Sequence, residues 1–432
     1  MKVKIEDAGP CRKVMHVSAP AELLASDYQD VVKMFAKVAE VPGFRLGRAP
    51  MHVVERHYAK GIEEQAKERL VPRYYREALR EKEIVPVAIV DVRDVVFTKA
   101  EGMAFNVTID VAPEFKLPKY RKIPIKRGEV NITDKDVDDA QNRLLATLAR
   151  YEDVSGRSVK KDDLVKIDYR GTLDGMPIAD IVKESQGVGE GTDFWVLAGE
   201  PEFLPGLVDG LIGAAVGETK EINVHFPEDF RLTAIAGKNA AYSVVIKGIR
   251  EKVLPKLDAD ILRKAGVETE TALRQRLRDE LRAASERREK DRLKDEIAKF
   301  LLENTNFDLP QSIVAQETNL TLRSILQRIA MQGATETQID AQKNEILQAA
   351  TRTSVERVKL SYILSRIADE EKINVEESEI DAHVESMAKR YGVSSERLRV
   401  DLEKANGMER LRSDIRAERT SSFLLENAKI KD

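Results

Sequence analysis

The first 112 residues alternate between two hydrophobic periods, which predicts a mixture of helices and strands. Apolar residues recur every three or four positions between Leu24 and Ala39, as on the buried face of an amphipathic helix. We expect Ser18 to cap this helix, with Pro20 in its first turn. The other predicted elements are a strand at 12–17, a second helix at 53–82, and strands at 85–92 and 105–111.

Residues 113–154 are predicted to be an extended connector followed by one helix. Three prolines lie between positions 113 and 124, and proline interrupts regular elements. Thr133 and Asp136 have the spacing of a capping box, so a helix should begin there and run to Arg150.

Residues 155–250 alternate between short strand patterns and glycine-rich turns. The strand patterns centre on 165–169, 222–226 and 242–246. Asp174-Gly175 is typical of a hairpin turn, because these residues accept a positive φ. The block therefore predicts a small, curled antiparallel sheet.

Three spaced glycines, Gly187, Gly189 and Gly191, superficially suggest a phosphate-binding loop. Such a loop would need a strand–turn–helix context and a following Lys-Ser or Lys-Thr, and the sequence has neither. We therefore expect a flexible hairpin insert here and no use of ATP.

Residues 251–432 are predicted to be almost entirely helical. Only two of the 15 prolines and four of the 23 glycines lie beyond residue 250, and these residues are the strongest breakers of helices. The apolar stripes are narrow, which favours extended arms over a compact bundle. Between 274 and 296 both charge signs alternate, which indicates a solvated helix face with i,i+4 ion pairs.

Charge and cysteine content exclude several kinds of function. The 432 residues include 71 Lys and Arg against 75 Asp and Glu, a net charge of −4, so no overall basic field points to DNA or another nucleic acid. The lone Cys11 excludes an intrachain disulfide, a cysteine zinc site and an iron–sulfur cluster. His52 and His57 lie five residues apart with no third ligand nearby, so we expect no metal site.

Neither a membrane span nor a secretory signal is indicated. No run of 18 apolar residues occurs, and the first residues lack the apolar segment of a signal peptide. We expect a cytoplasmic protein of several domains, since one domain takes roughly 100–200 residues.

The segment from Gly43 to Pro50 is not explained by the building of a core. Phe44 lies there beside Arg45, with Arg48 close by. Such a loop suits docking, because phenylalanine supplies apolar anchorage and arginine binds carboxylate or phosphate through two hydrogen bonds. The alternative is an ordinary helix–helix turn with a buried phenylalanine and solvated arginines.

The loop sequence GFRLGRAP resembles the GFRxGxxP signature of the trigger factors, ribosome-associated bacterial chaperones. The resemblance covers the whole chain: an α/β head, a connector, a block similar to FKBP-type prolyl isomerases, and a helical region. It implies docking on the large ribosomal subunit beside the exit tunnel, on proteins and nearby rRNA, and helical arms that hold nascent and unfolded polypeptides. The residues that carry the docking prediction are Gly43, Phe44, Arg45, Leu46, Gly47, Arg48 and Pro50.

Prolyl isomerisation needs no nucleophile, metal or cofactor. Its barrier of about 18–20 kcal/mol arises from amide resonance, and a dry apolar pocket that favours the twisted imide lowers it. The FKBP resemblance implies a pocket formed by Tyr169, Ile178, Asp180, Trp195 (or Phe194), Phe203, Leu204, Leu207, Phe230 and Tyr242.

This pocket departs from the family pattern in three places. Ile178 stands where phenylalanine is usual, and the acid that follows is either lost at Ala179 or displaced to Asp180. Leu207 stands where an aromatic residue is usual, and an apparent insertion occupies 181–191. We therefore expect low isomerase activity.

The sequence as a whole predicts a multidomain α+β protein. It would have an α/β ribosome-binding head, an FKBP-like antiparallel half-barrel with a short helix, and a long all-α arm domain. The predicted parts are the head (1–112), a connector that packs with the helical domain (113–154), the isomerase domain (155–250) and the helical domain (251–432). Exposed apolar stripes on the arms also lead us to expect a homodimer of the free protein.

The predicted function is an ATP-independent chaperone that docks at the ribosomal exit tunnel and holds nascent chains, with weak prolyl isomerase activity. Two alternatives remain at this point. One is a prolyl isomerase whose arms merely recruit substrate, and the other is a holdase that works without the ribosome.

Overall fold

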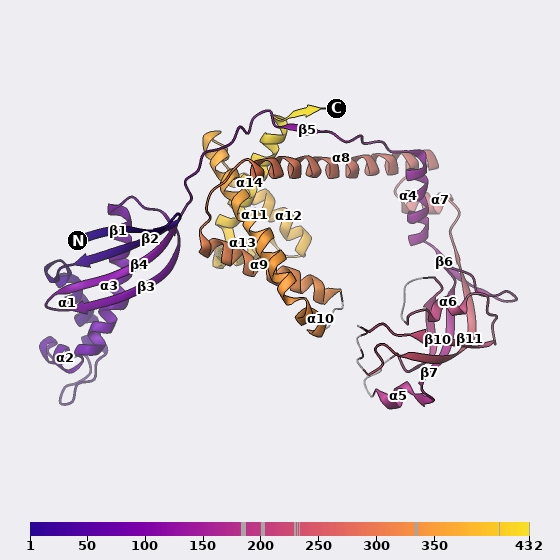
Figure 1. Cartoon of the computed structure of the whole chain (residues 1–432), viewed down its shortest axis with the longest axis horizontal. Helices are drawn as coiled ribbons and strands as arrows, with labels where there is room; N and C mark the ends of the chain where they lie inside the picture. The colour runs from indigo at the N-terminus through magenta and orange to yellow at the C-terminus, as the bar shows by residue number, and fades with distance from the viewer. Residues whose placement is uncertain are drawn as a thin grey trace. The chain divides into compact units, whose positions relative to one another are not determined.

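The computed structural model of the chain describes residues 1–182, 187–199, 204–228, 230, 232, 234–332, 336–405 and 407–431. The chain divides into two compact units (Figure 1). The first comprises Met1–Arg127, Arg292–Arg328 and Gln342–Asp432, and the second Gly128–Asp291 and Ile329–Ala341.

The first unit begins with a four-stranded antiparallel sheet. Its strands are β1 (Lys2–Gly9), β2 (Arg12–Ala19), β3 (Pro86–Thr98) and β4 (Gly102–Val111), in the order β1-β2-β4-β3. The helices of this region are α1 (Ala21–Val38), α2 (Met51–His57) and α3 (Ala59–Glu81), and the long helices α1 and α3 pack against the sheet (Figure 1). Alternate residues of β4, such as Phe105 and Ile109, share a buried core with Leu24 of α1 and Leu70 of α3.

Three details of this sheet differ from the prediction. Strand β1 was not predicted, because Val3 and Ile5 are the only large apolar residues in a charged segment. Ser18 lies within β2, and Pro20 occupies the N-cap position of α1, so the predicted serine cap is wrong. Strand β3 continues to Thr98 through three irregular pairings with β4.

The rest of the first unit is mainly helical. Its helices are the C-terminal part of α8 (Glu270–Glu303), α9 (Gln311–Met331), α11 (Lys343–Glu370), α12 (Glu377–Tyr391), α13 (Ser395–Lys404) and α14 (Gly407–Glu426). Strand β5 (Pro124–Lys126) lies parallel to β12 (Lys429–Lys431). Ile123 and Ile125 are buried in one cluster with residues of α8, α11 and α14, so this stretch completes the helical core.

A buried carboxylate joins the N-terminal sheet to helix α9. Asp110 of β4 is 1% exposed and accepts hydrogen bonds from Arg12 Nε at 2.8 Å and Nη2 at 3.1 Å. It also accepts from Ser312 Oγ at 2.6 Å and from the Ser312 backbone N–H at 3.1 Å, in the first turn of α9. Burial raises the pKa of Asp110, but the bonds from Arg12 and Ser312 outweigh burial and leave the pKa below its ordinary value.

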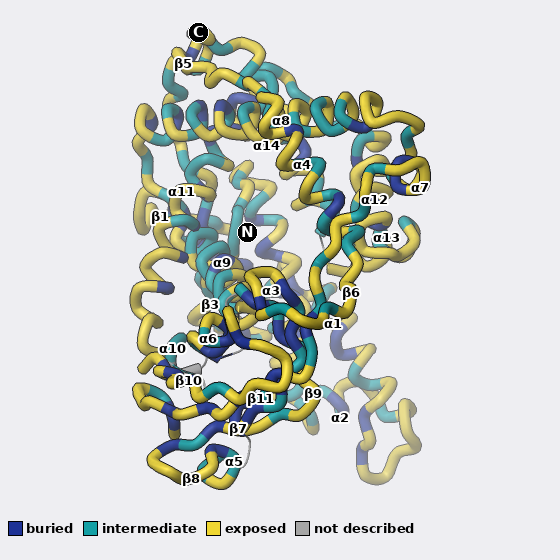
Figure 2. Tube along the Cα trace, turned by 90° about the vertical axis from the view of Figure 1, so that its right-hand side faces the viewer, coloured by how far each residue is buried: buried dark blue, intermediate teal, exposed yellow. Residues whose placement is uncertain are grey.

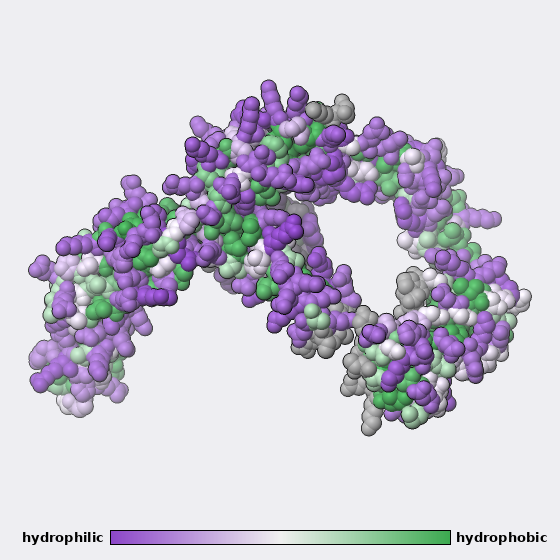
Figure 3. All heavy atoms as spheres, viewed as in Figure 1, coloured by the Kyte–Doolittle hydropathy of each residue, from purple (hydrophilic) through white to green (hydrophobic). Residues whose placement is uncertain are grey.

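The surfaces of the long helices agree with the predicted patterns. On α8, Arg276 pairs with Glu280, and Arg292 with Glu296, each four residues along a largely exposed helix (Figure 2). Apolar side chains also remain exposed on the C-terminal helices, and Figure 3 shows apolar surface among their charged groups. The exposed apolar residues of α9, α11, α12 and α13 include Leu320, Leu347, Val355, Tyr391 and Val400.

The second unit is built around a six-stranded sheet whose paired strands are all antiparallel. Its strands are β6 (Arg150–Val154), β7 (Leu164–Leu173), β8 (Met176–Pro177), β9 (Glu190–Leu197), β10 (Thr219–His225) and β11 (Asn239–Val253). β7 and β11 pair with each other; β6 and β10 flank β11, and β8 and β9 flank β7. The short helices α5 (Ile178–Ile181) and α6 (Leu207–Leu211) contribute to the single core on the inner face of this sheet.

The helices of the second unit come before and after the main strands of this sheet in the sequence. They are α4 (Asp134–Thr147), α7 (Ala259–Lys264), the N-terminal part of α8 and α10 (Glu336–Ala341). The predicted capping box of Thr133 and Asp136 is confirmed at the start of α4. The predicted end at Arg150 is wrong, because that residue begins β6, which pairs with the end of β11 from Ile249 to Val253. The chain thus passes into and out of the sheet through two adjacent strands.

Candidate functional sites

The loop between α1 and α2 is held by glycines and presents its large side chains to solvent. Gly43 and Gly47 have φ values of 86° and 72°, a region that favours glycine because it has no Cβ. At Gly47 a Cβ would also lie 3.1 Å from the carbonyl oxygen of Lys37. Phe44 is 45% exposed and Leu46 58% exposed. The alternative of a turn with a buried phenylalanine is therefore wrong.

The loop also carries free positive charge. Arg45 and Arg48 are both exposed, and neither forms an ion pair with any residue that the structure describes. The backbone is fixed locally by hydrogen bonds from Phe44 N to Val41 O at 3.0 Å and from Arg48 N to Arg45 O at 2.9 Å. An exposed aromatic ring beside two available guanidinium groups can bind an apolar hollow flanked by carboxylates or phosphates.

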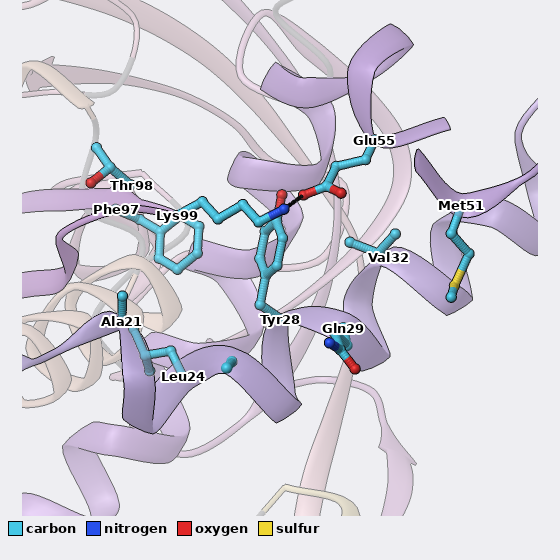
Figure 4. A pocket seen from close by; sticks show the side chains of 11 residues that line it. Ala21, Leu24, Tyr28, Gln29, Val32, Met51, Glu55, Phe97, Thr98 and Lys99 are labelled. Atoms are coloured by element: carbon cyan, nitrogen blue, oxygen red, sulfur yellow. Dashed lines mark hydrogen bonds and ion pairs between the residues drawn. The ribbon is translucent and has the colours of Figure 1, made fainter. Parts of the chain in front are cut away.

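A cavity of about 290 Å³ lies in the same head between α1, α2, the end of β3 and the turn from β3 to β4 (Figure 4). Tyr28 and Phe97 stack at 5.6 Å, and Lys99 lies 5.7 Å from the Tyr28 ring centroid while it pairs with Glu55. Burial, reinforced by Glu55, raises the pKa of Tyr28 to about 12. Sequence reasoning missed this cavity, because its walls come from three separate segments, each of which has an ordinary amphipathic pattern.

Most of the residues expected to form the prolyl pocket come together on the inner face of the second sheet. Tyr169, Ile178, Leu204, Leu207 and Tyr242 belong to one buried cluster. The rings of Tyr169 and Tyr242 are 6.4 Å apart. Burial raises the pKa of Tyr169 to about 12 and raises that of Tyr242 further, so both hydroxyls are protonated donors at neutral pH.

The remaining expected pocket residues are distributed differently. Phe194 makes an edge contact with Tyr169 at 5.9 Å, whereas its neighbour Trp195 lies on the other face of β9, where Arg250 stacks over its ring at 4.5 Å. Phe230 is partly buried and packs 4.6 Å from Phe226, which the sequence did not single out. Asp180 is exposed. Phe203 lies outside the described residues.

The predicted flexible hairpin insert is wrong for the part of it that the structure describes. Val188 is 0% exposed and belongs to the same core as Tyr169 and Tyr242. The hydroxyl of Tyr169 donates to Gly187 O, and that of Tyr242 donates to Val188 O at 2.8 Å. Residues 187–189 are therefore packed onto the two tyrosines, and Glu190 begins strand β9.

Three family models match successive stretches of the chain. Residues 1–144 match the family "Bacterial trigger factor protein (TF)", residues 271–426 match its C-terminal counterpart, and residues 155–249 match "FKBP-type peptidyl-prolyl cis-trans isomerase". The trigger factor of Opitutus terrae is 31% identical over 401 residues, which cover 92% of this chain and 91% of that protein. The chain belongs to the trigger factor family. The trigger factor of a Geobacillus species agrees, with 30% identity over 439 residues and all of both chains covered.

Family membership confirms the predicted function class. Like other trigger factors, the chain is a ribosome-associated chaperone that binds nascent polypeptides and contains an FKBP-type prolyl isomerase domain. The isomerase-first and ribosome-independent alternatives are not favoured. The predicted multidomain α+β fold is also confirmed: a solved trigger factor chaperone structure, whose title concerns promiscuous substrate recognition, aligns with a TM-score of 0.50 at 18% identity over 99% of each chain.

The described residues include neither a membrane-spanning helix nor a metal-binding cluster. None of the helices they form is both long and apolar enough to cross a membrane. Within the same residues, no group of three or more His, Cys, Asp or Glu side chains is arranged to hold a metal ion.

Proposed function

We propose that the loop from Gly43 to Pro50 is the docking element for the large ribosomal subunit beside the exit tunnel. The observation that carries this proposal is the exposure of Phe44 between two glycine-fixed turns, next to the unpaired charges of Arg45 and Arg48. Phe44 would fill an apolar hollow on a ribosomal protein. The arginines would pair with carboxylates of that protein and with phosphates of nearby rRNA.

The test is cosedimentation of the full chain with ribosomes after Phe44, Arg45 and Leu46 are all changed to alanine. We expect binding to be lost at physiological salt and the thermal melt to stay nearly unchanged, because loop-tip side chains contribute little to the core. The matched control changes three exposed residues of the same head, Val85, Arg93 and Val96, to alanine. This variant should bind ribosomes normally. Retention of the loop variant in the ribosome pellet would show that docking lies elsewhere.

We propose further that the prolyl site is formed by Tyr169, Ile178, Leu207, Phe230 and Tyr242. The cluster of these side chains supports this assignment, and the aliphatic Ile178 and Leu207 in place of aromatic rings support a low rate. In a protease-coupled assay with a proline peptide, the wild type should show low but measurable catalysis. Phe230→Ala should remove most of it, and unchanged activity would place Phe230 in the core rather than in the site.

We also propose how the parts of the chain share the work. The head (1–112) would dock, the isomerase domain (155–250) would act on prolyl bonds, and the helical domain (251–432), with the connector (113–154) packed on it, would hold clients through exposed apolar side chains such as Leu347. The same apolar surfaces support a homodimer of the free, cytoplasmic protein. Sedimentation velocity would detect that dimer, and a single monomeric boundary at micromolar concentration would contradict it.

A further inference from the structure

A short strap, defined as residues 187–189, precedes β9 and lies beside β7 at the proposed prolyl site. Its backbone is held at three consecutive carbonyl oxygens. The Tyr169 hydroxyl donates to Gly187 O, the Tyr242 hydroxyl donates to Val188 O at 2.8 Å, and the backbone N–H of Gly171 donates to Gly189 O at 2.8 Å. Two of the three donors are thus side chains of the site itself.

The strap also fills the site with an apolar side chain. Val188 is fully buried in the same cluster as Tyr169, Ile178, Leu207 and Tyr242, all of which are buried as well. The apolar floor that a prolyl ring would use therefore has almost no exposed surface. A proline can reach these side chains only if a residue packed on them moves, and Val188 of the strap is one of those residues.

Two glycines beside the strap let the backbone lie close to the two tyrosine rings. A Cβ on Gly191, just after the strap, would be 2.5 Å from the Tyr169 ring, and one on Gly171 would be 2.5 Å from the Tyr242 ring. Non-bonded carbon atoms do not approach this closely, so any larger residue at either position would displace a tyrosine ring or the backbone that carries the new side chain.

We infer that the strap is an internal occupant of the prolyl site, in which Val188 takes the place of the prolyl ring and its carbonyl takes the hydrogen bond of a substrate peptide. This inference rests on the proposed prolyl site. Because the strap contains no proline, it occupies the site without being turned over. Because the strap is part of the same chain as the site, its effective concentration there is high. A free short peptide must compete against that concentration for the site.

The strap thereby selects a class of substrate. A long unfolded chain held elsewhere on the same protein presents its prolines at a high effective concentration and can displace the strap. A short free peptide lacks that advantage. The site should favour extended, chaperone-bound polypeptides over small peptides.

The test is the full chain with Val188→Gly, assayed on a tetrapeptide that contains a phenylalanyl-proline bond. Loss of the buried isopropyl group weakens the strap, so kcat/KM should rise about tenfold. Val188→Ala retains more of the packing and should give a smaller rise. The matched control, Val188→Ile, keeps the site filled and should stay at or below the wild-type rate. Trp195, the only tryptophan, reports through its fluorescence whether the isomerase domain is folded in each variant.

The possible results separate the strap from the site. If folded Val188→Gly and Val188→Ala keep the wild-type rate while Phe230→Ala abolishes it, the site stands and the strap inference is overturned. If the wild type and both strap variants are folded but inactive, the site assignment fails, and the inference fails with it. A rise in both strap variants with no rise in Val188→Ile supports the inference.

Discussion

Replacing Asp110 by asparagine should loosen the join between the N-terminal sheet and helix α9. The carboxylate accepts four hydrogen bonds, two from Arg12 and two from Ser312. An asparagine has one acceptor oxygen, and its amide N–H groups would face the donors on the other side. In the wild type Oδ1 accepts only from Arg12 Nε, whereas Oδ2 accepts the other three bonds. The variant therefore loses at least the bond from Arg12 Nε if its oxygen occupies the Oδ2 position, and three bonds if it occupies the Oδ1 position.

The expected loss of stability follows from the burial of Asp110 and of its partners Arg12 and Ser312. Hydrogen bonds to a charged group contribute about 1.5–3 kcal/mol each, and loss of one partner of a buried pair costs about 3–5 kcal/mol. The Arg12 side chain is 30% exposed and can recover some hydration. We therefore expect a loss of about 2–3 kcal/mol, which corresponds to roughly a 30- to 150-fold rise in local opening.

The assay is amide hydrogen exchange of the full chain, read from peptides that cover residues 308–316 and the ends of β2 and β4. Faster exchange there, with unchanged exchange in the isomerase domain, is the expected result. The matched control is Asp7→Asn, because Asp7 pairs with Lys13 on the exposed surface, and such pairs contribute little. Equal exchange in Asp110→Asn and wild type would show that the buried carboxylate does not hold the join.

The same join should depend on pH. The folded-state pKa of Asp110 lies below its ordinary value, so its contribution is complete above the unfolded value of about 3.9 and is lost as the pH falls through the folded value. The difference in exchange between wild type and Asp110→Asn should therefore be constant from about pH 7 to 5 and shrink below about pH 4. A difference that grows on acidification would contradict this account.

Three further predictions concern single positions and one deletion. Gly102→Ala should lower the melting temperature of the head strongly, because φ is 104° and the Cβ would lie 2.2 Å from a backbone oxygen of β2; Gly43→Ala, with positive φ but open space, should cost only about 1 kcal/mol. Gly171→Ala should unfold the isomerase domain, read from Trp195 fluorescence, and a native emission spectrum would refute the packing described above. Deletion of 155–250, with a short flexible linker in its place, should abolish proline-peptide catalysis but keep most of the suppression of client aggregation in light scattering. Loss of protection in a folded deletion variant would make the isomerase domain the main client site.

The sequence predicted best those elements whose signal is local. Leu24, Tyr28 and Val31, whose spacing predicted a helix, lie on the buried face of α1. Asp174 and Gly175 both adopt the positive φ values of a tight hairpin turn. In each case a few neighbouring residues determine the conformation, through helix periodicity or steric tolerance of positive φ.

Features that depend on distant partners were not predictable in this way. Val188 looked like part of a loose glycine-rich insert, and its burial depends on Tyr169 and Tyr242, which are 19 and 54 positions away in the sequence. The sequence did not show whether Phe194 or Trp195 contributes to the prolyl pocket. The pairing of β9 with β7 places the two side chains on opposite faces of the sheet. Asp110 had no sequence signature, because its bonding partners lie 98 and 202 positions away.

The parallel pairing of β5 with β12 has a consequence for the synthesis of this chaperone itself. Residues of β5 are made roughly 300 positions before those of β12. At about 5–20 residues per second, the ribosome needs about 15–60 s to cover that distance. The strands of the N-terminal sheet are synthesised before β5, and those of the isomerase domain are synthesised within this interval. Both regions can therefore fold while Ile123 and Ile125 still lack α14 and β12. During its own translation, this protein exposes the kind of apolar segment that trigger factors shield on other nascent chains.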